Sequence, residues 1–356
     1  MRKRFSILLI LAVLCTISMV SCSKSESDDT VTAQEGKRKL YIYNWTYYTP
    51  DSIIEQFEEE FNVDVIIDNY ASNEAMFAKL KASQGGYDIV VPSADYTSIM
   101  IKLDMLEKLD HSKIPNLQYL TQKARTLSGQ YDPDFSYSVP YFIGAAGIAV
   151  NTDKVSDYEK DWTIFAEEEL AGRMQLLDDM NEVMGIALKT LGYSVNSVDI
   201  AELEEAGNLI NSQWKPNIVK FDAEGFGKAF SQGEFWVSHA YPEVIFEELP
   251  QQMWESVDFF LPETGGPLYI DSMVILKGAE NSDIAHEFIN FFHRPEIYAL
   301  FLDEFFYPSS VNEAAAEFRT TEAYYSNEDL LNYELKVDLG EDLEKYNKVW
   351  QTIRYQ

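Results

Sequence analysis

The sequence has few cysteines, few basic residues and no long hydrophobic run beyond its first segment. It contains two Cys, and 28 Lys and Arg stand against 59 Asp and Glu, so the formal net charge is −31 at pH 7. Binding along a nucleic-acid backbone requires clusters of basic side chains, so this composition argues against a nucleic-acid partner. The acidity favours a cationic partner, although a solvated acidic surface is the simpler reading of the charge alone.

The motifs that carry catalytic chemistry are also missing. No G-x-x-x-x-G-K-[ST], G-x-G-x-x-G, H-E-x-x-H or G-x-S-x-G pattern occurs. The four histidines are scattered, and although His286 and His293 could share a helical face, a metal site needs a third ligand at suitable spacing. We therefore predict no catalytic residue, no metal site and no cofactor, and hence a protein that is not an enzyme.

The N-terminal segment has the layout of an export signal. Basic residues at 2–4 precede an apolar run at 5–20, and a small residue and a cysteine follow. This order is typical of a secretory signal peptide, which we assign to residues 1–21. No second hydrophobic segment of membrane length follows, so a polytopic membrane protein is excluded.

The cysteine that ends this segment is informative. Residues 19–22 (MVSC) resemble a bacterial lipobox, in which the cysteine is lipidated before cleavage and becomes the first residue of the mature protein. Residues 22–39 lack the apolar side chains needed to pack and read as a flexible tether. We therefore expect a periplasmic protein that is held to the membrane only by a lipid on Cys22.

The first part of the exported chain alternates strands and helices. Strands are expected at 40–45, 63–67 and 87–91, and helices at 50–61 and 71–83, because apolar residues recur there at helical spacing. This order predicts a parallel sheet with helices on both faces, where ligands bind at the carboxyl ends of the strands. The loops after Trp45 and Val91 are therefore the first places to look for a site.

The rest of the chain has its own α/β character. An extended stretch is expected at 140–150, a strand at 269–276, and helices from near Asp179, at 201–209 and at 283–293. Two α/β lobes joined by two extended crossings, near 141–148 and 269–274, fit this order better than two independent domains.

Aromatic and carboxylate residues gather near the ends of the expected elements. They are Trp45, Thr46 and Tyr48 after the first strand, Ser93 and Asp95 after the third, Asp179 and Glu182 at a helix start, and Asp271 inside an apolar strand. Asp179-x-x-Glu182 matches an acidic form of the helix capping box, and aromatic residues commonly pack in cores. Asp271 is harder to explain, because a buried carboxylate without a partner is costly.

Short motifs occur in a characteristic order along the chain. They are YNWTxY at 43–48, YDIVVPS at 87–93, SVPY at 138–141, DDxxE at 178–182 followed by LGYS at 191–194, DS at 271–272 and YP at 307–308. In order and spacing they resemble the spermidine/putrescine-binding proteins of bacterial ABC transporters, over residues 40–340. The resemblance implies a type II periplasmic-binding-protein fold, in which two lobes, each a mainly parallel sheet flanked by helices, close on a linear polyamine. Lobe 1 would comprise 40–143 and 272–313, and lobe 2 would comprise 144–271 and 314–356.

The resemblance also implies roles for the matched positions. Asp179 and Glu182 would meet ammonium groups from lobe 2, and Asp271 would recognise a charged nitrogen near the hinge. The remaining ligand-binding positions would be Trp45, Thr46, Tyr48 and Ser93 from lobe 1, together with Tyr241, Tyr269 and Tyr307. Tyr241 and Tyr269 fall where the family usually has Trp, which is the stronger cation–π partner.

Two positions depart further from the family pattern. Asp95, which we include among the ligand-binding residues, stands where a spermidine-binding relative has Tyr. Lys336 falls near a position at which the family has a ligand-contacting Gln. Since a lysine beside a polycation is repulsive, we expect Lys336 either to point away from the ligand or not to correspond to that position.

The leading hypothesis is a lipid-anchored protein that captures spermidine or putrescine and delivers it to an ABC permease. A polyamine needs aromatic walls for its methylenes and carboxylates for its nitrogens, and the sequence supplies both. One alternative is the same scaffold with another small cationic or zwitterionic ligand, for which Arg173 and Arg294 are candidate carboxylate partners outside the motifs. A second alternative is a surface interaction protein that uses the acidic exterior.

Overall fold

The computed structural model describes residues 37–46, 48–82 and 85–355. The predicted signal peptide, Cys22 and most of the predicted tether lie outside these residues. Within the described part of the chain, no helix has both the length and the apolar character needed to cross a bilayer.

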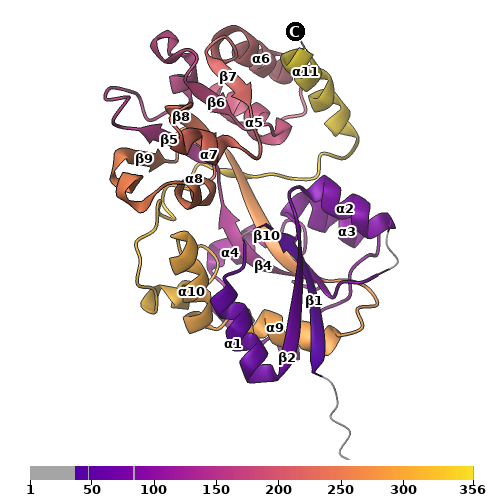
Figure 1. The fold of residues 1–356 in the computed structure, drawn as a ribbon. Coiled ribbons are helices and arrows are strands. Elements are labelled where there is room, and N and C mark those ends of the chain that lie inside the picture. Colours follow the sequence, from indigo (N-terminus) through magenta and orange to yellow (C-terminus); the bar gives the residue numbers. More distant parts are fainter. Residues whose placement is uncertain (1–36, 47, 83–84, 356) are drawn as a thin grey trace, which may run out of the picture. The chain divides into compact units, whose positions relative to one another are not determined.

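Strands and helices alternate along most of the described chain (Figure 1). The strands are β1 (Arg38–Trp45), β2 (Val63–Tyr70), β3 (Ile89–Val90), β4 (Ser138–Gly144), β5 (Gly147–Asn151), β6 (Met174–Leu176), β7 (Ile218–Phe221), β8 (Val237–Ala240), β9 (Val257–Phe260), β10 (Pro267–Ile275) and β11 (Glu334–Leu335). The helices are α1 (Asp51–Phe61), α2 (Asn73–Ala82), α3 (Ala94–Lys102), α4 (Gln122–Ser128), α5 (Met180–Thr190), α6 (Ile200–Leu209), α7 (Phe226–Ser231), α8 (Pro242–Glu248), α9 (Ser282–Phe292), α10 (Pro295–Phe305) and α11 (Leu343–Tyr355).

The first sheet is built around β1, and its neighbours β2 and β3 both run parallel to it. The strand order is β11-β10-β3-β1-β2, and β4 pairs with the other edge of β10. Side chains of a strand alternate between the two faces of its sheet. Leu40 and Ile42 therefore pack with Phe57 of α1 and Phe292 of α9, whereas Tyr43 packs with Met76 of α2 on the opposite face.

The second sheet has the order β7-β6-β8-β5-β9. Strand β6 runs parallel to β7 and β8, and β5 runs antiparallel to β8 and β9. Both sheets are therefore mixed, although mainly parallel sheets were expected. In each sheet three parallel strands lie together at one end, β3-β1-β2 in the first and β7-β6-β8 in the second, and antiparallel strands are added beside them.

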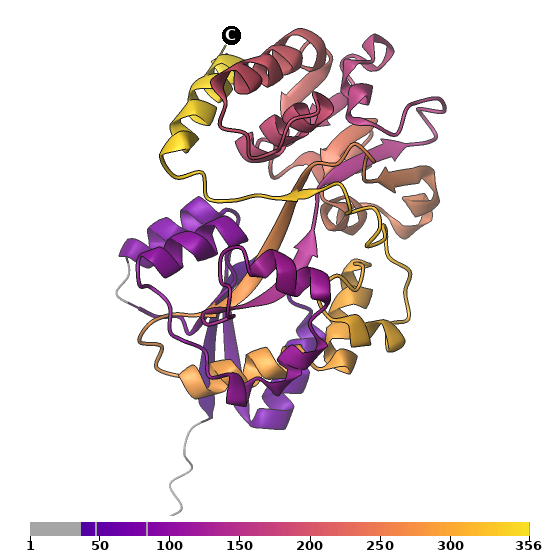
Figure 2. The same ribbon diagram turned by 180° about the vertical axis from the view of Figure 1, so that it is seen from behind.

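The two predicted crossings are neighbouring strands. Strand β4 of the first sheet leads through Ala145 and Ala146 into β5 of the second sheet. Strand β10 brings the chain back from the second sheet to the first. Strands β4 and β10 pair antiparallel, with Tyr269 opposite Gly144, and both views show them side by side (Figures 1 and 2). The crossings thus support each other through a shared ladder of hydrogen bonds.

A third passage of the chain follows α10. It runs from the short helix η7 (Glu313–Glu317), which packs against α10, to α11, which packs against α5 and α6. On the way β11 pairs with β10 at Pro267 and Leu268. This segment is visible in yellow between the two sheets (Figure 2). The residue bounds of the two lobes remain a prediction.

Candidate functional site

The carboxylate of Asp271 joins three segments that are distant in the sequence. Its Oδ1 accepts a hydrogen bond of 2.6 Å from the Ser93 hydroxyl, and its Oδ2 accepts one of 2.9 Å from the Tyr48 hydroxyl. Tyr48 follows β1, Ser93 is the N-cap of α3, and Asp271 lies on β10 with only 4% of its surface exposed. The buried carboxylate of Asp271 therefore has two hydrogen-bond donors, as expected for a polar group inside an apolar strand.

The pairing of β10 with β4 is irregular beside Asp271, where β4 has one extra residue, Tyr141. The register of β10 against β4 shifts between Asp271 and Ser272, and Asp271 forms an isolated antiparallel bridge with Ser93. Such bulges redirect a side chain and are common next to binding sites. The side chain of Asn73 adds support, because it bonds both the backbone N–H and the hydroxyl of Ser93.

Tyrosine rings surround this carboxylate. The rings of Tyr241 and Tyr269 lie edge to face at 5.8 Å, and Tyr307 stacks on Phe142 at 3.9 Å. Burial raises the pKa of Tyr48 well above its usual value, and the negative charge of Asp271 raises it further. Tyr269 and Tyr307 lie in the same region as this pair.

Trp45 and Thr46 lie along the same edge of the first sheet. The Trp45 indole packs on Tyr70 at 4.7 Å and donates a hydrogen bond of 2.9 Å to the carbonyl of Val91. The Tyr70 hydroxyl donates to that same carbonyl. Thr46 is exposed and its hydroxyl reaches only the carbonyl of Tyr70, at 3.5 Å. Trp45 is thus fixed beside the loop that carries Ser93.

The sequence reading missed Glu243. This residue lies in the first turn of α8, two residues after Tyr241, and its Oε2 has no hydrogen-bond partner among the described residues. The hydroxyl of Tyr307 faces this carboxylate and has no other partner in the described chain. Burial and, to a smaller extent, the negative charge of Asp271 together raise the pKa of Glu243 to about 7. Proline followed by an acidic residue is an ordinary helix-start pattern, which is why its sequence carried no site signal.

A second acidic group lies at the start of α5. Asp179 is the N-cap, and its Oδ1 accepts a hydrogen bond of 3.0 Å from the backbone N–H of Glu182. The expected capping box is therefore half formed, because the Glu182 side chain does not return to the cap. Its Oε1 instead pairs with Lys336 Nζ at 2.5 Å, and its buried Oε2 has no partner in the described part of the chain.

Lys336 lies among these carboxylates, and its ammonium pairs with Glu182. Its orientation relative to a ligand remains a prediction. Burial lowers the pKa of this lysine, but Glu182, Tyr241 and Asp179 raise it well above its usual value, so it carries a full positive charge. Asp95, in the first turn of α3, belongs to the same group. Burial raises the pKa of Asp95, and the nearby Lys336 ammonium opposes that rise.

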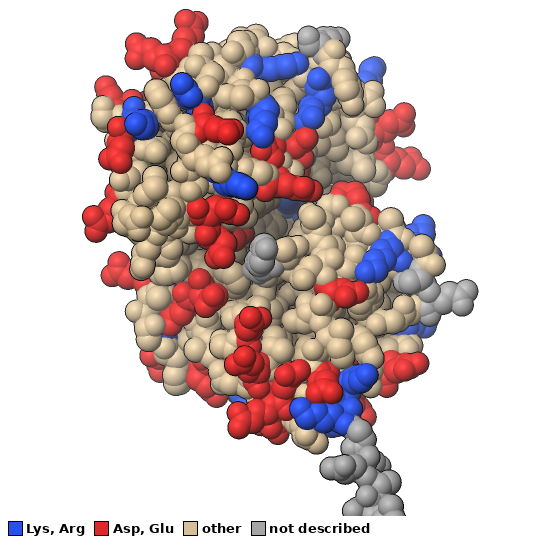
Figure 3. Space-filling model, viewed as in Figure 1, with Lys and Arg blue, Asp and Glu red and all other residues tan. Residues whose placement is uncertain are grey.

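The site thus has two acidic ends. The Asp271 end comprises Asp271 and Glu243 with Tyr48, Tyr269 and Tyr307, and the Glu182 end comprises Glu182, Asp179, Asp95 and Lys336. No ion pair joins Asp271 or Glu243 to a basic side chain in the part of the protein that is described. In the space-filling view, acidic side chains surround a hollow between the half that carries α1 and α2 and the half that carries α5 and α8 (Figure 3).

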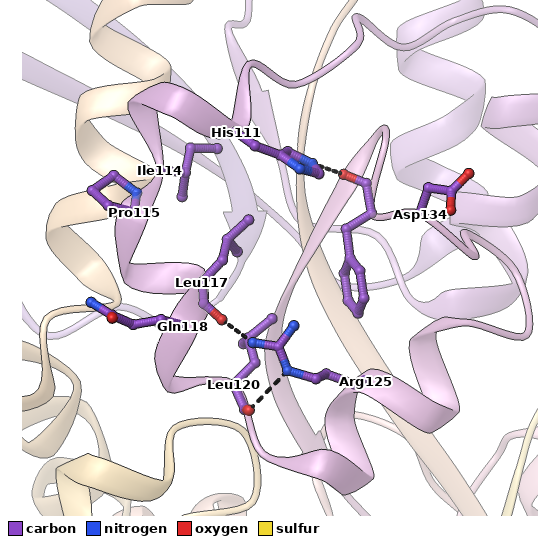
Figure 4. A pocket seen from close by; sticks show the side chains of 9 residues that line it. His111, Ile114, Pro115, Leu117, Gln118, Leu120, Arg125 and Asp134 are labelled. Atoms are coloured by element: carbon purple, nitrogen blue, oxygen red, sulfur yellow. Dashed lines mark hydrogen bonds between the residues drawn. The ribbon is translucent and has the colours of Figure 1, made fainter.

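The other features do not form a competing site. A cavity of about 420 Å³ lies beside α4, but its Arg125 already donates hydrogen bonds to the carbonyls of Leu117 and Leu120 (Figure 4). His286 and His293 both contact backbone groups. No three His, Cys, Asp or Glu side chains are grouped to hold a metal ion within residues 37–46, 48–82 and 85–355.

The raised pKa of Glu243 gives a pH-dependent stability. Because burial holds its pKa at about 7 in the folded protein, against an ordinary value of 4.5, the neutral form is favoured by folding. That contribution is complete below about pH 4.5 and is lost as pH rises through about 7, at a cost of up to roughly 3 kcal/mol. We expect Glu243→Gln to melt several degrees above the wild type near pH 8, with no difference near pH 4.5. Melting curves in polyamine-free buffers measure this, and a difference that does not vary with pH would contradict it.

Comparison with known proteins places the chain in a family. The family model described as bacterial extracellular solute-binding protein matches residues 52–330. The spermidine/putrescine-binding periplasmic protein of Escherichia coli (strain K12) is 34% identical over 340 residues, which is 93% of this chain and 94% of that protein. A putrescine/cadaverine-binding protein of Pseudomonas aeruginosa is 33% identical over 265 residues, which is 71% of this chain and 74% of that protein.

Among solved structures, the TpPotD lipoprotein of Treponema pallidum superimposes with a TM-score of 0.87. It is 50% identical, and the match covers 89% of this chain and 100% of that one. This agreement covers both sheets and the strands that join them, so it confirms the expected two-lobed fold. The chain belongs to the bacterial extracellular solute-binding proteins.

Proposed function

We propose that this protein binds a polyamine between its two sheets and delivers it to an ABC permease. The observation that carries the proposal is the Asp271 end, where the buried carboxylate of Asp271 and the partly buried carboxylate of Glu243 lie among tyrosine rings without a basic partner in the described chain. Burial raises the pKa of Asp271 to about 6, although Ser93 and Tyr48 lower it. An ammonium group that binds there supplies the missing counter-charge, and the rings contact the methylenes beside it.

The relatives support the same ligand class. The Escherichia coli relative is named for spermidine and putrescine, and the Pseudomonas aeruginosa relative for putrescine and cadaverine. These ligands are linear chains of methylenes between ammonium groups, so they match a site with acidic ends and aromatic walls. Binding needs no bond-making chemistry, which fits a transport protein better than an enzyme.

A zwitterionic ligand fits the site less well. An amino acid carries a carboxylate that needs a basic partner, and both candidate arginines are engaged elsewhere. Arg294 makes two hydrogen bonds to Glu60, and Arg173 is exposed and lies over the Trp236 ring at 5.0 Å. Neither contacts Asp271 or Glu243, so the site favours a ligand that carries only positive charge.

The membrane link belongs to the same proposal. The lipobox-like residues 19–22 would place a lipid on Cys22, and the 50% identical Treponema pallidum structure is described as a lipoprotein. Residues 22–39 would then tether the folded part in the periplasm beside its permease. Metabolic labelling with a radioactive fatty acid tests this step, because Cys22→Ser should abolish the label.

Calorimetry on the chain from Ser23 onward tests the ligand. We expect putrescine or spermidine to bind with one-to-one stoichiometry and micromolar or better affinity, which corresponds to about −8 kcal/mol or below. At a ligand concentration 100 times Kd, unfolding is opposed by about 2.7 kcal/mol more, which a thermal shift detects. GABA, choline and glutamate serve as comparison ligands. A response to one of these without any response to polyamines would reject the proposal.

A further inference from the structure

We propose that Lys336 occupies one ammonium position of the site and thereby makes the protein select a diamine over a triamine. This inference rests on the proposed polyamine function and adds to it a specificity-determining residue. It concerns the Glu182 end, where the protein supplies a cation of its own.

The backbone around Lys336 is held in place. Lys336 directly follows β11, and its N–H donates a hydrogen bond of 3.0 Å to the carbonyl of Leu268 on β10. The side chain is 19% exposed and ends on Glu182, whose side chain is 1% exposed. A pair this deep is unlike a surface ion pair, because removing either partner leaves a charge in poorly solvated surroundings.

The surroundings show that the ammonium belongs to the site. Its charge acts on Asp95, Asp179 and Tyr241 at its own end and also on Asp271 at the other. Lys336 therefore lies where a cationic ligand would extend from the Asp271 end. A ligand ammonium that approached Glu182 would meet the lysine ammonium at short range, and like charges there repel strongly.

The free acceptors fit a shorter ligand. Asp271 and Glu243 have no basic partner in the described chain, and the hydroxyl of Tyr307 faces the Glu243 carboxylate at the same end. The Asp271 end therefore accepts a ligand ammonium without competition, whereas the Glu182 end already holds the ammonium of Lys336. The third ammonium of spermidine must either displace Lys336 from Glu182 or remain beside it, and both alternatives weaken binding.

The variant Lys336→Gln tests the inference directly. Glutamine keeps a polar donor for Glu182 but removes the charge, so we expect the spermidine Kd to fall by about tenfold, while the putrescine Kd changes by less than about threefold. Lys189→Gln is the matched control. Lys189 is 17% exposed and pairs with a glutamate, Glu334, outside the two acidic ends, so both affinities should stay as in the wild type.

The outcomes separate this inference from the function on which it rests. If the wild type binds no polyamine, the proposed function fails. If the wild type binds polyamines and Lys336→Gln leaves the ratio of the two Kd values unchanged, only the role of Lys336 fails.

A structure of the unaltered protein provides a second test that does not depend on the variant folding. In crystals grown with putrescine, we expect Lys336 Nζ to remain on Glu182 and the ligand to occupy the Asp271 end. A ligand nitrogen on Glu182, with the lysine turned away, would overturn the inference.

Discussion

Replacing Asp271 by Asn is expected to weaken polyamine binding by roughly 10- to 100-fold, which is the loss of one charge-assisted hydrogen bond worth about 1.5–3 kcal/mol. The same change should raise the melting temperature of the ligand-free protein at about pH 8. Burial raises the pKa of Asp271 to about 6, so at that pH the ionised carboxylate opposes folding, and a neutral amide removes this cost. Affinity and stability should therefore move in opposite directions.

Asp88→Asn is the matched control for this prediction. Asp88 is also buried on the first sheet, at 2% exposure, but its carboxylate bonds Tyr41 and Asn281 outside both acidic ends. We expect this variant to lose stability and to keep its affinity, as measured by thermal melting and calorimetry. If Asp271→Asn bound as tightly as the wild type, the ligand site would have to lie elsewhere.

Replacing Glu182 by Gln is expected to have the largest effect on folding. The change leaves the Lys336 ammonium without its nearest counter-charge, and breaking a buried ion pair in this way costs roughly 3–5 kcal/mol. Affinity for polyamines should fall as well, because an uncompensated cation then remains in the site. The N-cap is not the cause, since Asp179 bonds the backbone N–H of residue 182, which the substitution keeps.

Two further variants isolate the ion pair. Asp179→Asn keeps a good N-cap and should cost little stability. The double variant Glu182→Gln with Lys336→Gln has no unpaired charge at this position, so it should recover most of the stability that Glu182→Gln loses. Melting temperatures of the three proteins decide the matter. A double variant that was no more stable than Glu182→Gln would show that the pair is not the source of the loss.

Much of the fold follows from local patterns. Apolar residues at helical spacing place α1, α2, α6 and α9 within a few residues of their observed bounds. Pro50 was expected to be the first helical residue and is instead the N-cap of α1. The mixed sheets could not be predicted in the same way, because strand direction depends on which segments become neighbours and not on the composition of each strand.

The site was predictable where a residue contradicted its surroundings. Asp271 stood out as a carboxylate in an apolar strand, and the structure gives it two hydrogen bonds. Asp95 does not cap α3, because Ser93 occupies the cap position and Asp95 lies in the first turn. Its neighbour Tyr96 packs against Phe77 of α2. The roles of these residues in ligand binding remain predictions.

Lys336 could not be placed from the sequence. It follows a strand of only two residues in a tail without clear periodicity, and its partner lies 154 residues away in the chain. The contact between Lys336 and Glu182 depends on the path that the segment between η7 and α11 takes from one sheet to the other. The expectation that a lysine repels a cationic ligand considered the ligand alone. It left out the carboxylates of Glu182 and Asp179, whose negative charges the lysine ammonium offsets.

The lysine at position 336 also bears on how such a transporter could change during evolution. A lysine codon becomes a glutamine codon by substitution of its first nucleotide alone. Glutamine still offers the Glu182 side chain a hydrogen-bond donor, although the buried carboxylate then loses its counter-charge. If Lys336 sets the selectivity as we propose, one point mutation would be enough to extend ligand binding from diamines to triamines.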